Sequence, residues 1–230
     1  MSSRELVLIG NFLPDRQESM LRFGQLIADG MQARGWTVKV WRPRPRFANL
    51  AGTYRYGGIP KYLGYLDKFF VFPRTIRRQA RRGKPDTAYH IVDHSNAVYV
   101  RSLRGHHVLV TCHDLLQIRS ALGEFPQHRV SRSGQKYQQW ILDSLRAAPK
   151  IVCISRKTQK DLQRLTGLGL HPTLARDPGR GVGVRDLVAT ACELPAQLDL
   201  ERVTGEVVDE DAHRGVAAAA LQPSERLTSS

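Results

Sequence analysis

Short apolar runs alternate with amphipathic stretches along the first 166 residues of the chain. The run Glu5–Gly10 is continuous and ends at a glycine, which suits a strand buried on both faces of a sheet, and Val108–Cys112 is a second buried run. We predict five strands in all: Glu5–Gly10, Trp36–Trp41, Thr87–Val92, Val108–Cys112 and Lys150–Ile154.

Between these runs, apolar residues recur at spacings of three and four, which is typical of helices with one buried face. The first helix follows Ser19, its predicted N-cap, and ends before Gly35, its predicted C-cap. We predict further helices over Ile59–Arg82, Ala97–Leu103, Val130–Ala147, and from a cap at Ser155 to about Leu165. The alternation predicts an α/β fold with a Rossmann-like, doubly wound parallel sheet, and any ligand site at the carboxyl ends of its strands.

The composition changes near Gly167. The last aromatic residue is Trp140, the last isoleucine is Ile154 and the last lysine is Lys160, whereas Ala, Leu, Val, Arg, Gly, Asp and Glu dominate residues 168–230. We therefore divide the chain into a domain over residues 1–166 and an aberrant or disordered tail over residues 167–230. Our hypothesis for the tail is a frameshift or gene truncation in a GC-rich genome.

The formal net charge is +14, and it is unevenly distributed. Residues 1–167 hold 29 Lys and Arg against 11 Asp and Glu, whereas residues 168–230 hold 6 against 10. A basic domain favours anionic partners such as phosphates or an anionic membrane surface. Four arginines can share one helix face as an anionic-lipid surface, although a solvated face explains them equally well: Arg74, Arg77, Arg78 and Arg81. No nucleic-acid-binding motif accompanies them, so we expect no nucleic-acid partner.

The cysteines and the apolar runs bear on the cellular setting. Cys112, Cys153 and Cys192 show no metal-ligand spacing, and the first two lie in apolar runs. Reduced cysteines of this kind predict a cytoplasmic protein without a metal site. No apolar run is long enough to cross a membrane, so any membrane contact is expected to be peripheral.

The strongest candidate for chemistry is His113, which follows the strand Val108–Cys112 together with Asp114. A histidine at the carboxyl end of a buried strand can act as a donor, as a base or as a positioning group, because its pKa lies near neutrality. It can equally serve to hold a loop carbonyl. His94 follows the preceding strand and belongs to the same predicted crevice, where Asp93, Ser95 and Asn96 also suit turn formation.

The second candidate is the loop Asn11–Ser19 after the first strand, which leads into a helix N-terminus. Asn11, Arg16, Gln17 and Ser19 are predicted to contact a sugar or a phosphate, and capping of the helix by Asp15 and Ser19 is the alternative. The loop has no G-x-G-x-x-G and is therefore not a dinucleotide fingerprint.

Two pieces of the sequence resemble family-four glycosyltransferases of the GT-B type. One is the strand Val108–Cys112 with the His-Asp that follows it. The other is Ile151–Ser155, which leads into the Thr-x-x-Asp-Leu of the last predicted helix. In their order and spacing, these pieces make residues 4–167 similar to the N-terminal, acceptor-side domain of that family.

The resemblance implies two Rossmann-like domains that face each other across a cleft, of which the second binds a nucleotide-sugar donor. It implies a retaining hexosyltransferase that needs no metal or other cofactor. It places His113 beside the donor sugar and the loop Asn11–Ser19 near the phosphates and the acceptor, which would be lipid-linked or a glycan of the cell envelope. We recognise no donor-binding domain in residues 167–230, so we expect these 230 residues to have little activity alone.

Two other hypotheses remain open. In the first hypothesis, the domain is a non-catalytic basic module that binds anionic lipid or a protein partner. In the second hypothesis, it is a small nucleotide-binding enzyme. The absence of a Gly-rich loop argues against the second.

Overall fold

The computed structural model describes residues 4–51 and 58–168, and the predicted tail over residues 167–230 lies outside them apart from its first two residues. Five parallel strands form one sheet in the order β2-β1-β3-β4-β5. The strands are β1 (Glu5–Ile9), β2 (Thr37–Trp41), β3 (Ala88–Ile91), β4 (His107–Cys112) and β5 (Ile151–Cys153). The predicted Rossmann-like α/β fold is confirmed, and each predicted strand differs from the observed one by at most one residue at either end.

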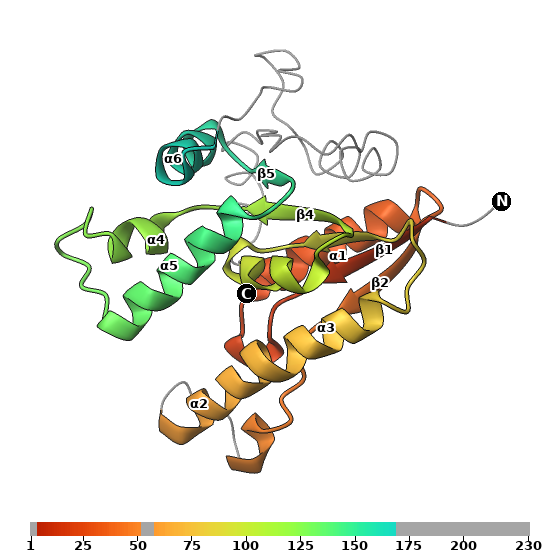
Figure 1. Ribbon diagram of the computed structural model, residues 1–230, viewed down its shortest axis with the longest axis horizontal. Coiled ribbons are helices and arrows are strands. Elements are labelled where there is room, and N and C mark those ends of the chain that lie inside the picture. The colour runs from red at the N-terminus through yellow and green to blue at the C-terminus, as the bar shows by residue number, and fades with distance from the viewer. Residues whose placement is uncertain (1–3, 52–57, 169–230) are drawn as a thin grey trace, which may run out of the picture.

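Helices cover both faces of this sheet (Figure 1). Helix α1 (Glu18–Gln32) packs Ile27 and Met31 against Leu6 and Leu8 on one face. On the other face, Val7, Ile9 and their neighbours meet α3 (Phe72–Ala80), the 3₁₀ helix η4 (His94–Leu103) and α5 (Arg132–Arg146). Because side chains alternate along a strand, β1, β3, β4 and β5 contribute buried residues to both cores, which explains their continuous apolar runs in the sequence. The edge strand β2 is mostly exposed, and only Val38 and Trp41 pack against the cores from it.

The remaining helices are shorter or lie at the margins of the sheet. Helix α4 (Leu116–Ala121) follows β4 and was not predicted, and α6 (Arg156–Thr166) follows β5. Ser155 caps α6 as predicted, because its Oγ accepts a hydrogen bond from the Thr158 backbone N–H at 3.1 Å. Gly167 ends α6 with a φ of 70°, a left-handed conformation that glycine adopts without strain.

The predicted N-cap of the first helix is wrong. Helix α1 begins at Glu18, and Gln17 is its N-cap residue, without a side-chain cap bond. Ser19 therefore lies within the first turn of the helix. The Gln17 side chain accepts a hydrogen bond from the Asn11 side chain in the preceding loop and makes no hydrogen bond to the first turn of the helix.

The predicted helix Ile59–Arg82 is continuous but not uniformly α-helical. It consists of α2 (Gly58–Leu66), a π-helical turn η3 (Asp67–Val71) and α3. Pro73 lacks an N–H group, and its ring displaces the carbonyl four residues earlier. The wider turn lies directly before this proline, and the Phe72 N–H bonds to the Asp67 carbonyl five residues back.

The π turn fixes three consecutive side chains to different parts of the domain. Buried Asp67 accepts from the backbone N–H groups of Phe47 and Ala48, at 3.0 Å from its nearer oxygen to each. Lys68 forms an ion pair with Asp15 at 2.6 Å, and Phe69 packs against Tyr137 and other aromatics of α5. The long helix is thus held to the 3₁₀ turn η2 (Ala48–Ala51), to the loop after β1 and to α5.

Candidate functional site

The polar side chains after three neighbouring strands meet at one edge of the sheet. Asn11 follows β1, Asp93 follows β3 and His113 follows β4. The chain leaves β1 towards β2 on one side, whereas β3, β4 and β5 continue on the other. The strand order therefore reverses between β1 and β3, and such a reversal opens a crevice at the carboxyl ends of the strands. We call Asn11, Asp93, Asn96 and His113, together with His94, the crevice cluster.

Asp93 is the centre of this cluster. Its carboxylate accepts hydrogen bonds from the Asn11 side chain at 2.6 Å, and from the backbone N–H and hydroxyl of Ser95 at 2.9 and 2.7 Å. The Asn96 amide in turn donates to Asn11 Oδ1 at 2.9 Å. Burial alone would raise the pKa of Asp93, but the adjacent His94 and the bonds from Ser95 and Asn11 hold it below its ordinary value. The cluster therefore contains a fixed negative charge at neutral pH.

His113 is held in one orientation by its neighbours. Its Nε2 lies 2.9 Å from the Val92 carbonyl oxygen, and the Phe23 ring from α1 meets the imidazole edge-on with 4.7 Å between ring centroids. Because a carbonyl can only accept, Nε2 carries the proton, and Nδ1 is the acceptor of the neutral ring. Burial lowers the pKa of His113 against the opposing effects of the Val92 carbonyl and Asp93. At neutral pH this residue presents an acceptor atom and is not a general acid.

His94 lies at the rim of the cluster. Its Nδ1 is 3.4 Å from Asp93 Oδ1, close enough for an ion pair when the ring is protonated. The geometry is not that of a hydrogen bond, and this buried nitrogen has no hydrogen-bond partner among the described residues. His94 Nδ1 could therefore form a hydrogen bond with an anionic group or a hydroxyl that enters the crevice.

The loop after β1 is divided between the crevice and the surface. Asn11 and Gln17 join the cluster through their mutual hydrogen bond, and the 3₁₀ turn η1 (Leu13–Asp15) is anchored by the ion pair of Asp15 with Lys68. Arg16 has a left-handed φ of 51° and an exposed side chain, and Ser19 is also exposed. The structure thus brings Asn11, His94 and His113 of the predicted site together and joins the exposed Gln17 to them through Asn11. Arg16 and Ser19 remain outside this network.

The sequence placed Asp93 in the predicted crevice only as part of a four-residue run that also suits a turn, and it did not single out Lys68 or Phe23. Asp93 stands in an Asp-His-Ser-Asn run whose local signal is turn formation, and indeed it also caps η4 through the Ser95 N–H. Its contact with Asn11 spans 82 residues, which no local pattern reveals. Lys68 and Phe23 lie inside helices, where their spacing indicates only packing.

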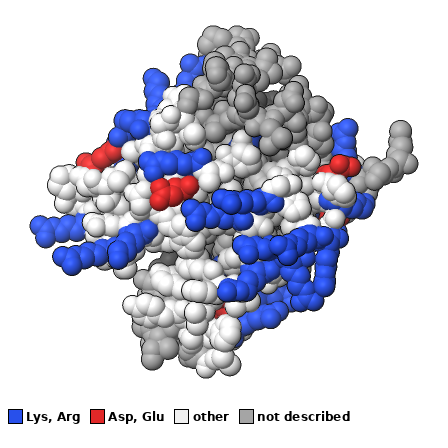
Figure 2. All heavy atoms as spheres, in the orientation of Figure 1, with Lys and Arg blue, Asp and Glu red and all other residues white. Residues whose placement is uncertain are grey.

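The predicted arginine surface lies away from the crevice cluster. Arg74, Arg77, Arg78 and Arg81 line one shallow hollow of about 270 Å³ on α3, together with Arg82. Figure 2 shows that Lys and Arg gather over α3, while the end of the molecule formed by α2 carries little charge.

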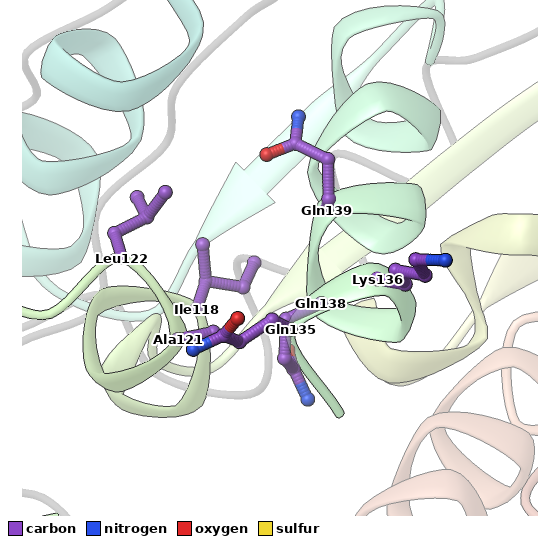
Figure 3. A pocket seen from close by; sticks show the side chains of 7 residues that line it. All are labelled: Ile118, Ala121, Leu122, Gln135, Lys136, Gln138 and Gln139. Carbon is purple, nitrogen blue, oxygen red and sulfur yellow. The ribbon is translucent and has the colours of Figure 1, made fainter. Parts of the chain in front are cut away.

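A second hollow, of about 230 Å³, lies between α4 and α5 (Figure 3). Helix α5 supplies its polar side chains, and α4 with the residue after it supplies the apolar ones. The lining residues are Ile118, Ala121, Leu122, Gln135, Lys136, Gln138 and Gln139. None of them belongs to the crevice cluster.

Within residues 4–51 and 58–168, no group of three or more His, Cys, Asp and Glu side chains is placed to hold a metal ion. None of the helices in those ranges is long and apolar enough to cross a membrane.

Comparison with known proteins gives one family. The model of Glycosyltransferase Family 4 matches residues 24–172, which is more than half of the chain. The match includes β2 to α6 with His94 and His113, and it begins after the loop that contains Asn11 and Gln17. No curated protein matches the chain.

Proposed function

The chain belongs to glycosyltransferase family 4, with residues 24–172 in the N-terminal half of the GT-B fold, and on that basis we propose that it provides the acceptor-side half of a sugar-transfer site. The observation that carries the proposal is the crevice cluster at the β1/β3 reversal, where Asn11, Asp93 and His113 converge. Fixed amide, carboxylate and imidazole groups are the partners that sugar hydroxyls require.

We assign His113 a positioning role for the donor sugar. Nε2 is occupied by the Val92 carbonyl, so Nδ1 accepts a hydrogen bond from a sugar hydroxyl. We assign Asn11 and Gln17, in the loop after β1, to the acceptor and the phosphates. In the complete reaction, a hexose would pass from a nucleotide sugar to the acceptor with retention of anomeric configuration and without a metal.

We propose that the reaction takes place in the cytoplasm. The acceptor is either a lipid-linked molecule at the inner face of the membrane or a glycan of the cell envelope or of a polysaccharide. We also propose that these 230 residues on their own turn over little nucleotide sugar, because transfer needs donor-binding groups across the cleft. Release of a sugar from a panel of UDP-, GDP- and ADP-hexoses by the purified chain would overturn this last proposal and leave the crevice assignment standing.

Binding tests the crevice directly. We expect UDP- or GDP-hexoses to bind the purified chain weakly, and His113→Ala to weaken that binding about fivefold, as for one hydrogen bond. The matched control is His128→Ala, since His128 is exposed and distant in sequence from the crevice residues. Equal affinities for both variants, measured by ligand-observed NMR, would remove His113 from the site.

The same role of His113 sets a pH dependence. Because burial lowers the pKa of His113 from its ordinary value, the ring is neutral at pH 7–8 and Nδ1 keeps its lone pair. Binding should be constant in that range and should fall in acid, as protonation removes the acceptor.

The non-catalytic alternative draws its support from the arginine hollow of α3. A chain that binds anionic vesicles but shows no saccharide or nucleotide binding in the crevice would favour it over the transfer site.

A further inference from the structure

The exposed apolar side chains are concentrated in one part of the domain. Eleven large hydrophobic residues are exposed within residues 4–50 and 62–168, and six of them lie in the two short segments 47–50 and 62–70. These segments are neighbours, because Asp67 in the second binds the backbone of Phe47 and Ala48 in the first. Single exposed apolar residues are ordinary, but a contiguous group of this size indicates a contact surface. The most exposed members, which we call the apolar tip, are Leu50 at 77%, Tyr62 at 69% and Phe70 at 56%.

The apolar tip continues directly into the arginines. A spacing of four residues carries one exposed stripe along the long helix, from Tyr62 through Leu66, Phe70 and Arg74 to Arg78. The two halves of the stripe touch, because the Arg74 guanidinium lies 5.9 Å from the Phe70 ring centroid and donates to the Phe70 carbonyl at 2.9 Å. Arg77, Arg81 and Arg82 then widen the basic half.

We propose that this stripe is a docking surface for an anionic lipid bilayer, with the aromatic residues in the interface and the arginines on the headgroups. The combination of exposed aromatic and aliphatic residues with a dense cationic row is complementary to such a surface. A cationic hollow without acidic residues in its lining repels a second copy of itself, so the charge argues against a symmetric contact. None of the residues of the stripe belongs to the crevice cluster, and the proposal does not depend on the transfer reaction.

Docking of this kind bears on the crevice through the π turn. Lys68 lies within the same helix and holds Asp15 of the loop after β1 at 2.6 Å. The ion pair therefore connects the helix that carries the stripe to the loop after β1. This connection would hold the crevice at a fixed distance from a bilayer to which the stripe is docked.

The test is sedimentation of the purified 230-residue chain with vesicles of phosphatidylcholine alone or with about one third phosphatidylglycerol. We expect binding to the anionic vesicles that weakens with added salt, and little binding to the neutral ones. Arg77→Gln/Arg78→Gln/Arg81→Gln should lower the partition coefficient roughly 100-fold, as three basic residues leave the surface. The control Arg22→Gln/Arg34→Gln/Lys160→Gln removes the same charge from exposed positions in α1, in the turn after α1 and in α6, and should bind within about twofold of the wild type.

A second pair of variants tests the apolar half. Tyr62→Ser/Phe70→Ser should weaken vesicle binding at every salt concentration, whereas Leu26→Ser/Leu122→Ser, which alters two other exposed leucines, should not. All these positions are exposed, and coincident circular dichroism spectra establish that each variant is folded. The proposal is wrong if the wild type ignores anionic vesicles, if the two charge variants bind equally, or if Tyr62→Ser/Phe70→Ser instead dissociates a dimer that does not bind vesicles.

Discussion

Replacement of Asp93 by alanine should destabilise the domain more than any other change in the crevice. The carboxylate is 4% exposed and accepts three hydrogen bonds, from Asn11 at 2.6 Å and from Ser95 at 2.9 and 2.7 Å. Each hydrogen bond to a charged acceptor contributes about 1.5–3 kcal/mol to stability. Two effects reduce the loss on substitution: water can replace the bonds to half-buried Ser95, and the cost of burying the carboxylate is removed. The Asn11 amide is the group left most poorly paired. We therefore expect Asp93→Ala to lower the free energy of unfolding by about 2–3 kcal/mol.

Urea unfolding monitored by tryptophan fluorescence measures this change. The matched control is Asp86→Ala, which removes an exposed carboxylate from the turn before β3 and should change the free energy of unfolding by less than about 0.5 kcal/mol. The pKa of Asp93 is lowered in the folded state, so its contribution is complete above about pH 4 and is lost as the pH falls through the folded pKa. Wild type and Asp93→Ala should thus converge only in strong acid. Equal stabilities of Asp93→Ala and Asp86→Ala at pH 7 would refute the central place of Asp93.

Three further changes have defined outcomes. Burial lowers the pKa of His90 to about 3 in the folded state. As the pH falls below 6.5, His90 is therefore protonated in the unfolded chain before it is protonated in the folded one, and the free energy of unfolding decreases. Between pH 7.5 and 5.0, His90 should account for a loss of about 2 kcal/mol, which urea unfolding of His90→Gln would no longer show. Phe69→Ala removes the aromatic contact between the π turn and α5 and should cost about 2–3 kcal/mol in the same assay. Ser155→Ala removes the cap of α6 and should cost about 1 kcal/mol, with faster hydrogen exchange confined to its first turn.

The regular part of the fold follows from local sequence patterns. Four of the five strands are buried on both faces, and their apolar runs therefore stand out from the amphipathic helices between them. The edge strand β2 is mostly exposed. Ser155 was predicted as a cap because the hydroxyl, the helix start and the preceding strand are adjacent in sequence. Helix α4 was missed because six residues are too few to display a helical period.

The crevice was only partly predictable, for physical reasons. Strand ends predicted where His94 and His113 lie, since parallel strands share one carboxyl edge. The hydrogen bond between Asn11 and Asp93 was not predictable, because it joins residues that are distant in sequence and the run around Asp93 also satisfies a local turn. The cap predicted at Ser19 failed because α1 begins at Glu18, which places Ser19 inside the first turn, and the Gln17 side chain in the N-cap position bonds to Asn11.

The π turn was also beyond sequence reasoning. Pro73 predicts some disturbance of the long helix, but not its form. A kink would have separated the apolar tip from the arginines, whereas the wider turn keeps the helix continuous and sets Asp67, Lys68 and Phe69 against three different elements. The exposed stripe depends on this continuity of the helix, and the sequence alone did not predict the π turn that preserves it.

The central claim is that the crevice cluster at the β1/β3 reversal binds sugar. Its most direct test is mapping of amide chemical shifts on the ¹⁵N-labelled chain during titration with methyl hexosides and with UDP- and GDP-hexoses. We expect perturbations confined to residues 11–17, 93–96 and 113–116, which form three segments at the same edge of the sheet. Perturbations confined to the hollow between α4 and α5, or none with any of these probes, would contradict it.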